Sequence, residues 1–316
     1  MIALRRISPG AWAMAALMAA SVDTARPQEI EPRAYAATPL GVLFSGVSLG
    51  YTTGGIAFDA TSPLSDVRAT VYTTAIGVGG TFALAGRTAN VSVGVPYAWA
   101  KITGNVQEVA ARVDRSGLAD ARLRFAVGLL GGRAMSLGEF VRHKPSTYVG
   151  TSVTIAMPTG QYFSDKLVNV GTNRWAFKPE VGFSRPVGPW TLELFGGAWF
   201  FTPNSSFLGD QKKTQDPLLS LQSHVGYLFG PRLWVSADAT FYSGGRSAVD
   251  DVPAPERQEN TRVGLTASLP VTRSNALRLA WSRGAITRAG SNFTTWTVGW
   301  QTTRIRRPAR PTVGGG

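Results

Sequence analysis

The chain of 316 residues contains no cysteine and only two histidines, His143 and His224. Without cysteine it can form neither disulfides nor thiolate metal sites, and a cysteine nucleophile is excluded. Two histidines are also too few for an all-histidine metal site. We therefore expect no metal and no cofactor in this protein.

Long apolar runs are also missing. Beyond the amino terminus, no segment approaches the roughly 18 continuous apolar residues that indicate a membrane-spanning helix. The mean hydropathy of +0.01 argues against a helical membrane protein and against a disordered chain. A transmembrane barrel would show such an average, because its lipid-facing apolar residues alternate with polar ones.

Negative charge is scarce: 19 Asp and Glu residues stand against 32 Lys and Arg residues, and the net charge is +13. An excess of this size is compatible with nucleic-acid binding. The basic residues are scattered, however, and they cluster only in the tail "RIRRPAR" at Arg304–Arg310. Because no basic stripe follows a helix, we expect no nucleic-acid partner.

The amino terminus has the order of a secretory signal peptide. Arg5 and Arg6 precede the apolar run "AWAMAALMAA" at 11–20, and small residues follow. The run is about half as long as a membrane-spanning helix requires. A short amphipathic helix is the alternative, but we assign residues 1–25 to a signal peptide and expect export to the periplasm.

Downstream, apolar and polar residues alternate with a period of two. In "RLWVSADATFYSGG" (232–245), Leu233, Val235 and Phe241 share one face and Asp238 lies on the other. This period indicates strands whose two faces meet different solvents. About twelve such runs are bounded by Gly, Pro, Asn or Asp. They lie near 41–57, 66–83, 89–101, 117–130, 147–158, 173–185, 189–203, 217–229, 232–244, 259–269, 275–285 and 293–303.

The length of these runs distinguishes lipid from a soluble core. Strands of soluble sandwiches average about 5–6 residues, whereas strands that cross a bilayer need about 9–11, and most of these runs reach the longer value. Short connections also alternate with long ones, which is typical of barrels with short periplasmic turns. We therefore predict an all-β fold, a transmembrane antiparallel β-barrel of about 12 strands over residues 41–303, followed by a basic tail at 304–316.

Two segments fall outside this pattern. The connection 131–146 is long where a short turn is expected, and the sequence "SLGEFVRHK" (136–144) has a helical pattern, so we expect a short periplasmic helix there. The segment 26–40 lacks alternation and precedes the first strand. It is either a periplasmic lead or a plug in the lumen, and the usual looseness of polar termini favours the lead.

Aromatic residues lie near the ends of the expected strands, as in the interfacial girdles of membrane barrels. We therefore expect outer-membrane lipid and lipopolysaccharide as partners. The residues are Tyr97, Trp99, Trp190, Trp199–Phe201, Tyr227, Phe229, Trp281 and Trp300.

Several motifs follow one another along nearly the whole mature chain. They are "EPRAY" (31–35), "DRSGLADARLR" (114–124), "SLGEF" (136–140), "LVNVGTNRWAFKPEVG" (167–182), "GPWTLEL" (188–194), "QDPLLSLQSHVGY" (215–227) and "DATFYSGGR" (238–246). By these motifs the chain resembles the outer-membrane transporter family named after the phenol meta-cleavage degradation pathway. The resemblance implies a barrel in the outer membrane of a Gram-negative cell, recognised by the barrel assembly machinery, that takes up small compounds including aromatic ones.

Ten charged residues at inward-facing positions form the candidate lumenal site. Six are basic and four are acidic, which gives +2 for the set, and such a surplus would favour anionic permeants. The alternative is that they pair across neighbouring strands and brace the barrel wall. The ten are Asp120, Arg122, Arg124, Arg174, Lys178, Glu180, Glu193, Asp238, Arg262 and Arg278.

The expected function is passive uptake of small solutes, aromatic or anionic ones among them, without catalysis. A structural barrel that transports nothing is one alternative. The other is a barrel-embedded lipid hydrolase that uses His224 with Ser220 or Ser223. Ser223 is adjacent to His224 in the expected strand and points to the opposite face, Ser220 lies far along the strand, and no G-x-S-x-G motif occurs. The hydrolase is therefore the weaker alternative.

Overall fold

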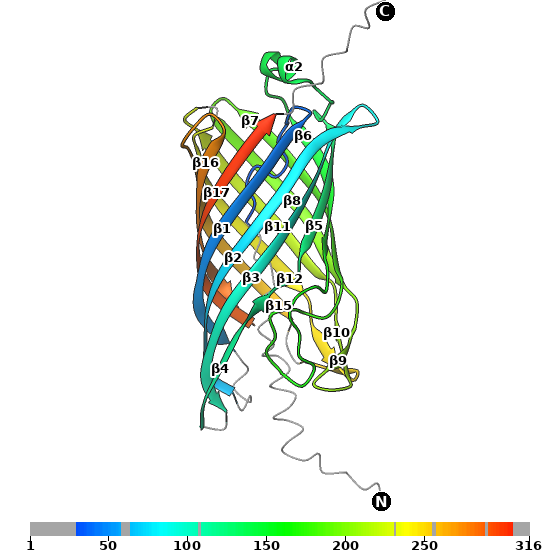
Figure 1. Ribbon diagram of the computed structural model, residues 1–316, viewed down its shortest axis with the longest axis vertical. Helices are drawn as coiled ribbons and strands as arrows, with labels where there is room; N and C mark the ends of the chain where they lie inside the picture. Colours follow the sequence, from blue (N-terminus) through cyan, green and yellow to red (C-terminus); the bar gives the residue numbers. More distant parts are fainter. Residues whose placement is uncertain are drawn as a thin grey trace, which may run out of the picture.

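The structure, a computed structural model, describes residues 30–57, 64–106, 109–230, 232–254, 257–287 and 290–305. These residues form a closed antiparallel β-barrel of twelve strands, with loops and a small second sheet at one end (Figure 1). The predicted barrel and its number of strands are confirmed. The predicted signal peptide, 1–25, lies outside the described residues, as does the tail from residue 306 onward.

Each barrel strand pairs antiparallel with the next along the chain, and the last strand pairs with the first to close the cylinder. Closure satisfies every strand edge, as a strand that crosses hydrocarbon requires. The strands are β1 (Val42–Ala57), β2 (Leu64–Leu84), β3 (Arg87–Val106), β4 (Val109–Leu118) continued by β5 (Arg122–Leu130), β6 (Tyr148–Ala156), β7 (Ala176–Val187), β8 (Trp190–Phe201), β11 (Leu218–Leu228), β12 (Trp234–Gly244), β15 (Gln258–Pro270), β16 (Asn275–Thr287) and β17 (Gly290–Ile305).

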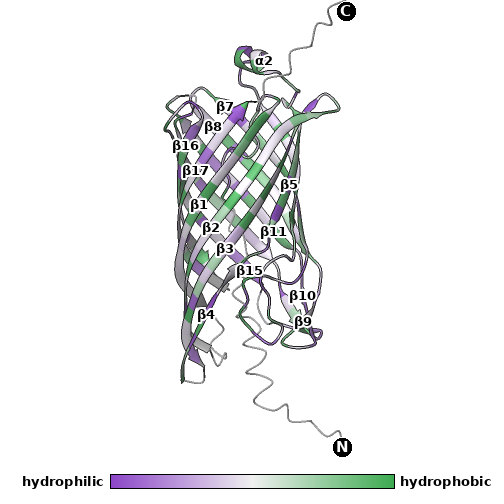
Figure 2. Ribbon diagram, viewed as in Figure 1, coloured by the Kyte–Doolittle hydropathy of each residue, from purple (hydrophilic) through white to green (hydrophobic). Residues whose placement is uncertain are grey.

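The two faces of the wall differ as the period of two predicts. In β12, Val235 and Phe241 are exposed on the outside, whereas Ser236, Asp238 and Thr240 are buried inside. Figure 2 shows the same alternation of hydrophobic and hydrophilic positions along the strands. Apolar side chains therefore cover the outer surface where lipid would lie, and polar ones line the lumen.

The alternation expected over 117–130 is interrupted, and this part of the prediction is wrong. Unbroken alternation over 117–130 would place Ala119 and Ala121 on the lipid face with Phe125, but both are buried in the break between β4 and β5. The reason lies in the backbone. The Ala119 N–H still donates to the carbonyl of Pro96 on β3, but the Ala121 N–H donates to the hydroxyl of Thr159. The pairing with β3 is shifted by one residue between β4 and β5, which reverses the faces of the residues that follow.

Some of the long connections between the expected strands contain strands of their own. Strands β2 and β3 reach 21 and 20 residues, about twice the length needed to cross a bilayer, and β4 pairs with the outer part of β3 within the expected loop 102–116. Two further connections form a small sheet of β9 (Asn204–Phe207), β10 (Gln211–Gln215), β13 (Ser247–Val249) and β14 (Val252–Pro253). Pairing between connections, which periodicity does not reveal, accounts for the difference.

The predicted short helix is confirmed as α2 (Leu137–Arg142). Ser136 and Glu139 form a capping box, and these hydrogen bonds lower the pKa of the exposed Glu139 carboxyl. In Figure 1, α2 lies at one end of the barrel and β4, β9 and β10 lie at the other. Since outer loops exceed periplasmic turns in length, the α2 end faces the periplasm. Within the described part of the chain, no helix has the length and apolarity to cross a membrane.

Candidate functional site: a charged lumen and its inner segment

Eight of the ten candidate charges lie on barrel strands. They are Arg122 and Arg124 on β5, Lys178 and Glu180 on β7, Glu193 on β8, Asp238 on β12, Arg262 on β15 and Arg278 on β16. All are buried or half-buried, in agreement with inward positions. They are spread over the strands from β5 to β16. Strands β17, β1, β2 and β3 carry none of them.

The other two candidates, Asp120 and Arg174, lie between strands and serve the outer loops. The carboxylate of Asp120 accepts hydrogen bonds from the backbone N–H groups of Gly160 and Thr172, at 2.9 and 3.0 Å. Arg174 donates to the side chain of Gln215 and stacks on a neighbouring aromatic ring. These two charges therefore hold loops together at the outer mouth.

Most of the remaining charges have partners on the same wall. Lys178 Nζ lies 2.6 Å from a carboxylate oxygen of Glu180, which also accepts a 3.3 Å hydrogen bond from Gln222. Arg262 donates to the hydroxyl of Ser282 at 3.0 Å. Such contacts reduce the cost of burying charge and brace the wall, as the alternative reading of these residues expects.

His224 is a member of this network that periodicity did not select as a site residue. Its Nδ1 lies 2.7 Å from Asp238 Oδ1, and the Asp238 carboxylate accepts further hydrogen bonds from Ser236 and Thr266. Within the described residues, His224 Nε2 has no hydrogen-bond partner. A nucleophilic serine needs its base within hydrogen-bond reach. Ser223 faces outward, and the inward hydroxyl of Ser220 makes no hydrogen bond to His224. The geometry therefore gives no support to the hydrolase alternative.

The described residues before β1, 30–41, lie inside the barrel, and Tyr35 is the best packed aromatic residue among them. Tyr35 is 2 % exposed. Its ring fits over two glycines that face each other on β6 and β7, Gly150 and Gly182. A Cβ added at Gly150 would lie 2.8 Å from the ring, and one at Gly182 would lie closer still. Larger residues at either position would close the slot.

The Tyr35 hydroxyl is bonded to the same wall. It shares a 2.7 Å hydrogen bond with the hydroxyl of Ser152 and donates to the Glu180 carboxylate at 3.1 Å. The Phe195 ring packs edge-on with centroids 4.8 Å apart, and the Arg124 guanidinium lies 5.1 Å from the centre of the tyrosine ring. Tyr35 thus makes both apolar and polar contacts that no loose terminus would retain.

Two further hydrogen bonds join the segment to strands β8 and β16. The backbone N–H of Arg33 donates to Glu193 at 2.7 Å, and Arg278 donates to the carbonyl of Pro32 at 3.2 Å. Nearer the periplasmic end, the N–H of Leu40 donates to the carbonyl of Met135. Residues from Pro32 to Leu40 are therefore tied to the charged strands and to the α2 connection.

A cavity of about 700 Å³ remains between this segment and the opposite wall. On the wall side it is lined by small residues of β1, β2, β3 and β17, such as Gly46, Ser48, Gly77, Gly94 and Gly299. On the other side it is lined by the segment and by charged residues. The space that the small side chains leave is comparable to the volume of an ordinary small-molecule site.

The charged lining of this cavity is mainly cationic. Arg122, Arg124 and Arg278 contribute to it, and Glu31 is the acidic residue that the inner segment adds. The carboxylate of Glu31 interacts electrostatically with Arg124, Lys178, Arg278 and Arg122. The lumen therefore holds a field that attracts carboxylates, and one carboxylate of the chain already lies in it.

The sequence alone did not select Glu31, Arg33 or Tyr35 as site residues, and His224 entered only with the hydrolase alternative. The first three belong to the motif "EPRAY". This motif is part of the resemblance to the transporter family, but the resemblance assigns no role to it. Within the described residues, no group of three or more acidic or histidine side chains is arranged to hold a metal ion.

A closed barrel with an apolar exterior and a polar, charged interior defines the class of outer-membrane β-barrel proteins. Within that class, the chain belongs to the family described as "Putative MetA-pathway of phenol degradation", whose model matches residues 46–302. No curated protein matches the chain.

Two solved structures have similar folds. The COG4313 outer membrane channel from Pseudomonas putida F1 is 20 % identical with a TM-score of 0.74, covering 87 % of this chain and 100 % of that chain. The transport unit of the autotransporter AIDA-I from Escherichia coli is 11 % identical with a TM-score of 0.50, covering 94 % and 99 %. At these identities the similarity concerns the fold.

Proposed function

We propose that this protein is a passive channel of the outer membrane for small solutes, with aromatic carboxylates as its favoured class. The cavity beside the inner segment carries the proposal, because it gives a solute of this size space within the lumen. The family description, which names phenol degradation, and the printed name of the similar Pseudomonas putida structure, a channel, support the same class.

The preference for carboxylates rests on the lining. Arginine guanidinium groups bind carboxylates through charge-assisted hydrogen bonds, and Arg122, Arg124 and Arg278 all border the cavity. The facing wall offers small, uncharged side chains on which an aromatic ring can slide without being held. A solute with a ring and one negative charge suits both sides.

The inner segment acts as a plug in this proposal. Its contacts through Tyr35, Arg33 and Pro32 support the plug over the lead, since each joins the segment to a strand of the charged wall. Glu31 then occupies the cationic field when no permeant is present. A carboxylate permeant would compete with Glu31 for the same cations.

Liposome swelling tests the proposal. Vesicles containing the protein are challenged with benzoate, a neutral aromatic such as benzyl alcohol, and a sugar of comparable size. We expect the order benzoate, neutral aromatic, sugar. Equal rates for all three solutes would indicate a size-limited porin and would refute the preference for aromatic carboxylates.

A structural barrel without transport is distinguished by the same assay. If the wild type and a variant lacking residues 26–38 both leave the vesicles impermeable to every solute, no transport occurs and the structural alternative holds. Insertion is checked independently by the resistance of the folded barrel to unfolding in unheated detergent gels. We also expect the barrel assembly machinery to insert this chain, and depletion of that machinery in cells should leave it in the periplasm.

A further inference from the structure

The outer surface of the barrel carries a row of aromatic side chains that lie in register on neighbouring strands. Each is the cross-strand partner of the next, so the row crosses five strands at one level. Tyr72, Trp99 and Trp296 have about half of their surface exposed to the outside. The members of the row are Trp281, Trp296, Tyr51, Tyr72 and Trp99.

This row marks the outer boundary of the bilayer. Along β2, Phe82 lies ten positions after Tyr72, near the periplasmic turn, and it contacts Phe125 on β5. A tilted strand crosses the hydrocarbon in about 9–11 residues, and aromatic residues collect at both of its edges. The parts of β1 to β4 beyond Tyr72 and Trp99 therefore project past the hydrocarbon on the cell exterior.

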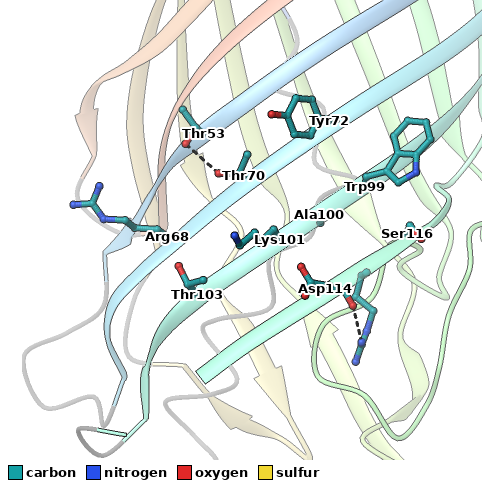
Figure 3. Close-up of a pocket in the computed structure, with 11 residues that line it drawn as sticks. Thr53, Arg68, Thr70, Tyr72, Trp99, Ala100, Lys101, Thr103, Asp114 and Ser116 are labelled. Carbon is teal, nitrogen blue, oxygen red and sulfur yellow. Dashed lines mark hydrogen bonds between the residues drawn. The ribbon is translucent and has the colours of Figure 1, made fainter. Parts of the chain in front are cut away.

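A hollow of about 670 Å³ lies directly beyond the row (Figure 3). Tyr72 and Trp99 form its membrane side. The register places Thr53, Thr70 and Lys101 at the next outward level, followed by Arg68 and Thr103 at the level after that. All of these residues belong to the outward-facing series of their strands, so the hollow faces the surrounding membrane and not the lumen.

The charge of this hollow is positive. Arg68 and Lys101 are both exposed. Asp114 of β4 also lines the hollow, but both of its carboxylate oxygens accept hydrogen bonds from the Arg112 guanidinium, at 2.7 and 3.1 Å. Asp114 is also the cross-strand partner of Lys101. With Arg112 as its ion-pair partner, this one carboxylate stands against three exposed cations, Arg68, Lys101 and Arg112.

We propose that this hollow binds the phosphorylated glucosamine headgroup of lipopolysaccharide. Arg68 and Lys101 would pair with a phosphate, and the hydroxyls of Thr53, Thr70 and Thr103 would hydrogen-bond to phosphate or sugar oxygens. The faces of Tyr72 and Trp99 would pack against sugar rings and the first acyl carbons. Basic residues just outside an aromatic belt are placed at the level where anionic headgroups lie.

The proposal rests on the outer-membrane location of the barrel and not on transport. The experiment uses the full-length protein in detergent, with lipid retention measured by native mass spectrometry. Three lipids are compared: bisphosphorylated lipid A, its monophosphoryl form and phosphatidylethanolamine. We expect the bisphosphorylated form to bind most tightly, and Arg68→Glu with Lys101→Glu to weaken it about tenfold or more.

A matched control carries the same change of charge at the other end of the molecule. Arg142→Glu with Lys144→Glu reverses two exposed charges on and beside α2, and we expect lipid A binding to remain as in the wild type. A second variant, Arg68→Gln with Lys101→Gln, retains polar bulk in case the reversal impairs folding. Equal loss in the control, equal binding of all three lipids, or unchanged binding in both hollow variants would overturn the proposal.

The outcome is independent of the channel. Because the hollow lies outside the barrel, both of its variants should retain wild-type rates in liposome swelling. Loss of lipid A binding with unchanged swelling supports the headgroup site, whatever the permeant proves to be. A protein that binds lipid A and transports nothing would leave this site intact and refute only the proposed function.

Discussion

The two sides of the lumen differ in charge. Strands β17, β1, β2 and β3 present glycine, serine, threonine and other uncharged residues inward, and none of their described inward positions is charged. The remaining strands present arginine, lysine, carboxylates and His224. Both sides obey the same outward pattern of apolar residues. Alternation therefore predicts which face of each strand lines the lumen, but it does not predict which contacts the lumenal side chains make.

The charged wall holds the inner segment because buried charges require partners. Glu180 and Glu193 each accept a hydrogen bond from the segment, from the Tyr35 hydroxyl and the Arg33 N–H respectively. The segment thus adds a partner to each buried carboxylate, to Glu180 beside its ion pair with Lys178 and to Glu193, and each added partner lowers the cost of burying the charge. We call the inward faces of β17, β1, β2 and β3 the smooth wall. Its described residues include no buried charge that requires a partner, and the cavity lies beside it. The difference predicts distinct effects for substitutions on the two sides.

The largest effect is expected from releasing the segment. Tyr35→Ala removes the ring from its glycine slot together with the hydrogen bonds to Ser152 and Glu180. We expect single-channel conductance in planar bilayers to rise several-fold, as it should when residues 26–38 are deleted. Tyr35→Phe is the control, because it keeps the ring and should raise conductance much less. If neither Tyr35→Ala nor the deletion changes conductance, the segment does not plug the lumen.

A smaller effect is expected from adding bulk to the smooth wall. Gly77 and Gly94 are cross-strand partners that line the cavity. A Cβ at Gly77 would have its nearest neighbour at 3.5 Å, so Gly77→Leu should fold and project into the cavity. We expect the rate of solute-driven swelling to fall by a factor of a few. Val95→Leu, on the exposed outer face of β3, is the matched control and should have no effect on this rate.

The sequence could predict the barrel because lipid imposes one rule on every strand. It could also predict the charged wall, because residues such as Lys178, Glu180 and Asp238 occupy the inward positions of their alternating strands. For the inner segment the sequence left a lead and a plug open and favoured the lead, because "EPRAY" has no period. Its position depends on tertiary contacts with Gly150 and Gly182, on strands more than a hundred residues away.

Asp120 shows a different limit. The alternation of the sequence placed Asp120 among the lumenal charges. The strand breaks there, however, and the carboxylate accepts hydrogen bonds from the N–H groups of Gly160 and Thr172. A short polar residue that satisfies loop amides gives the same sequence pattern as one that faces a pore. Periodicity alone cannot distinguish the two uses, because it records the side of the strand and not the partner.

Charge reversal on the charged wall should alter selectivity more than conductance. Arg122→Glu with Arg124→Glu changes two cavity-lining cations into carboxylates. We expect the reversal potential under a salt gradient to shift toward cation selectivity. Arg283→Glu, on the exposed outer face of β16, is the control and should leave the potential as in the wild type. An unchanged potential in the double variant would mean that ions do not pass these arginines.

The smallest effects are expected on the free energy of unfolding of the barrel. They should again differ between the charged wall and the smooth wall. Asp238→Ala leaves His224, Ser236 and Thr266 without their shared acceptor, and unsatisfied buried donors cost about 1–3 kcal/mol each. On the smooth wall, Thr295→Val removes one 3.1 Å hydroxyl contact with Thr52. That loss should be about 1 kcal/mol or less, because water in the lumen can replace the contact. Urea unfolding in lipid vesicles, followed by tryptophan fluorescence, measures both, and equal losses would show that the two walls are not differently built.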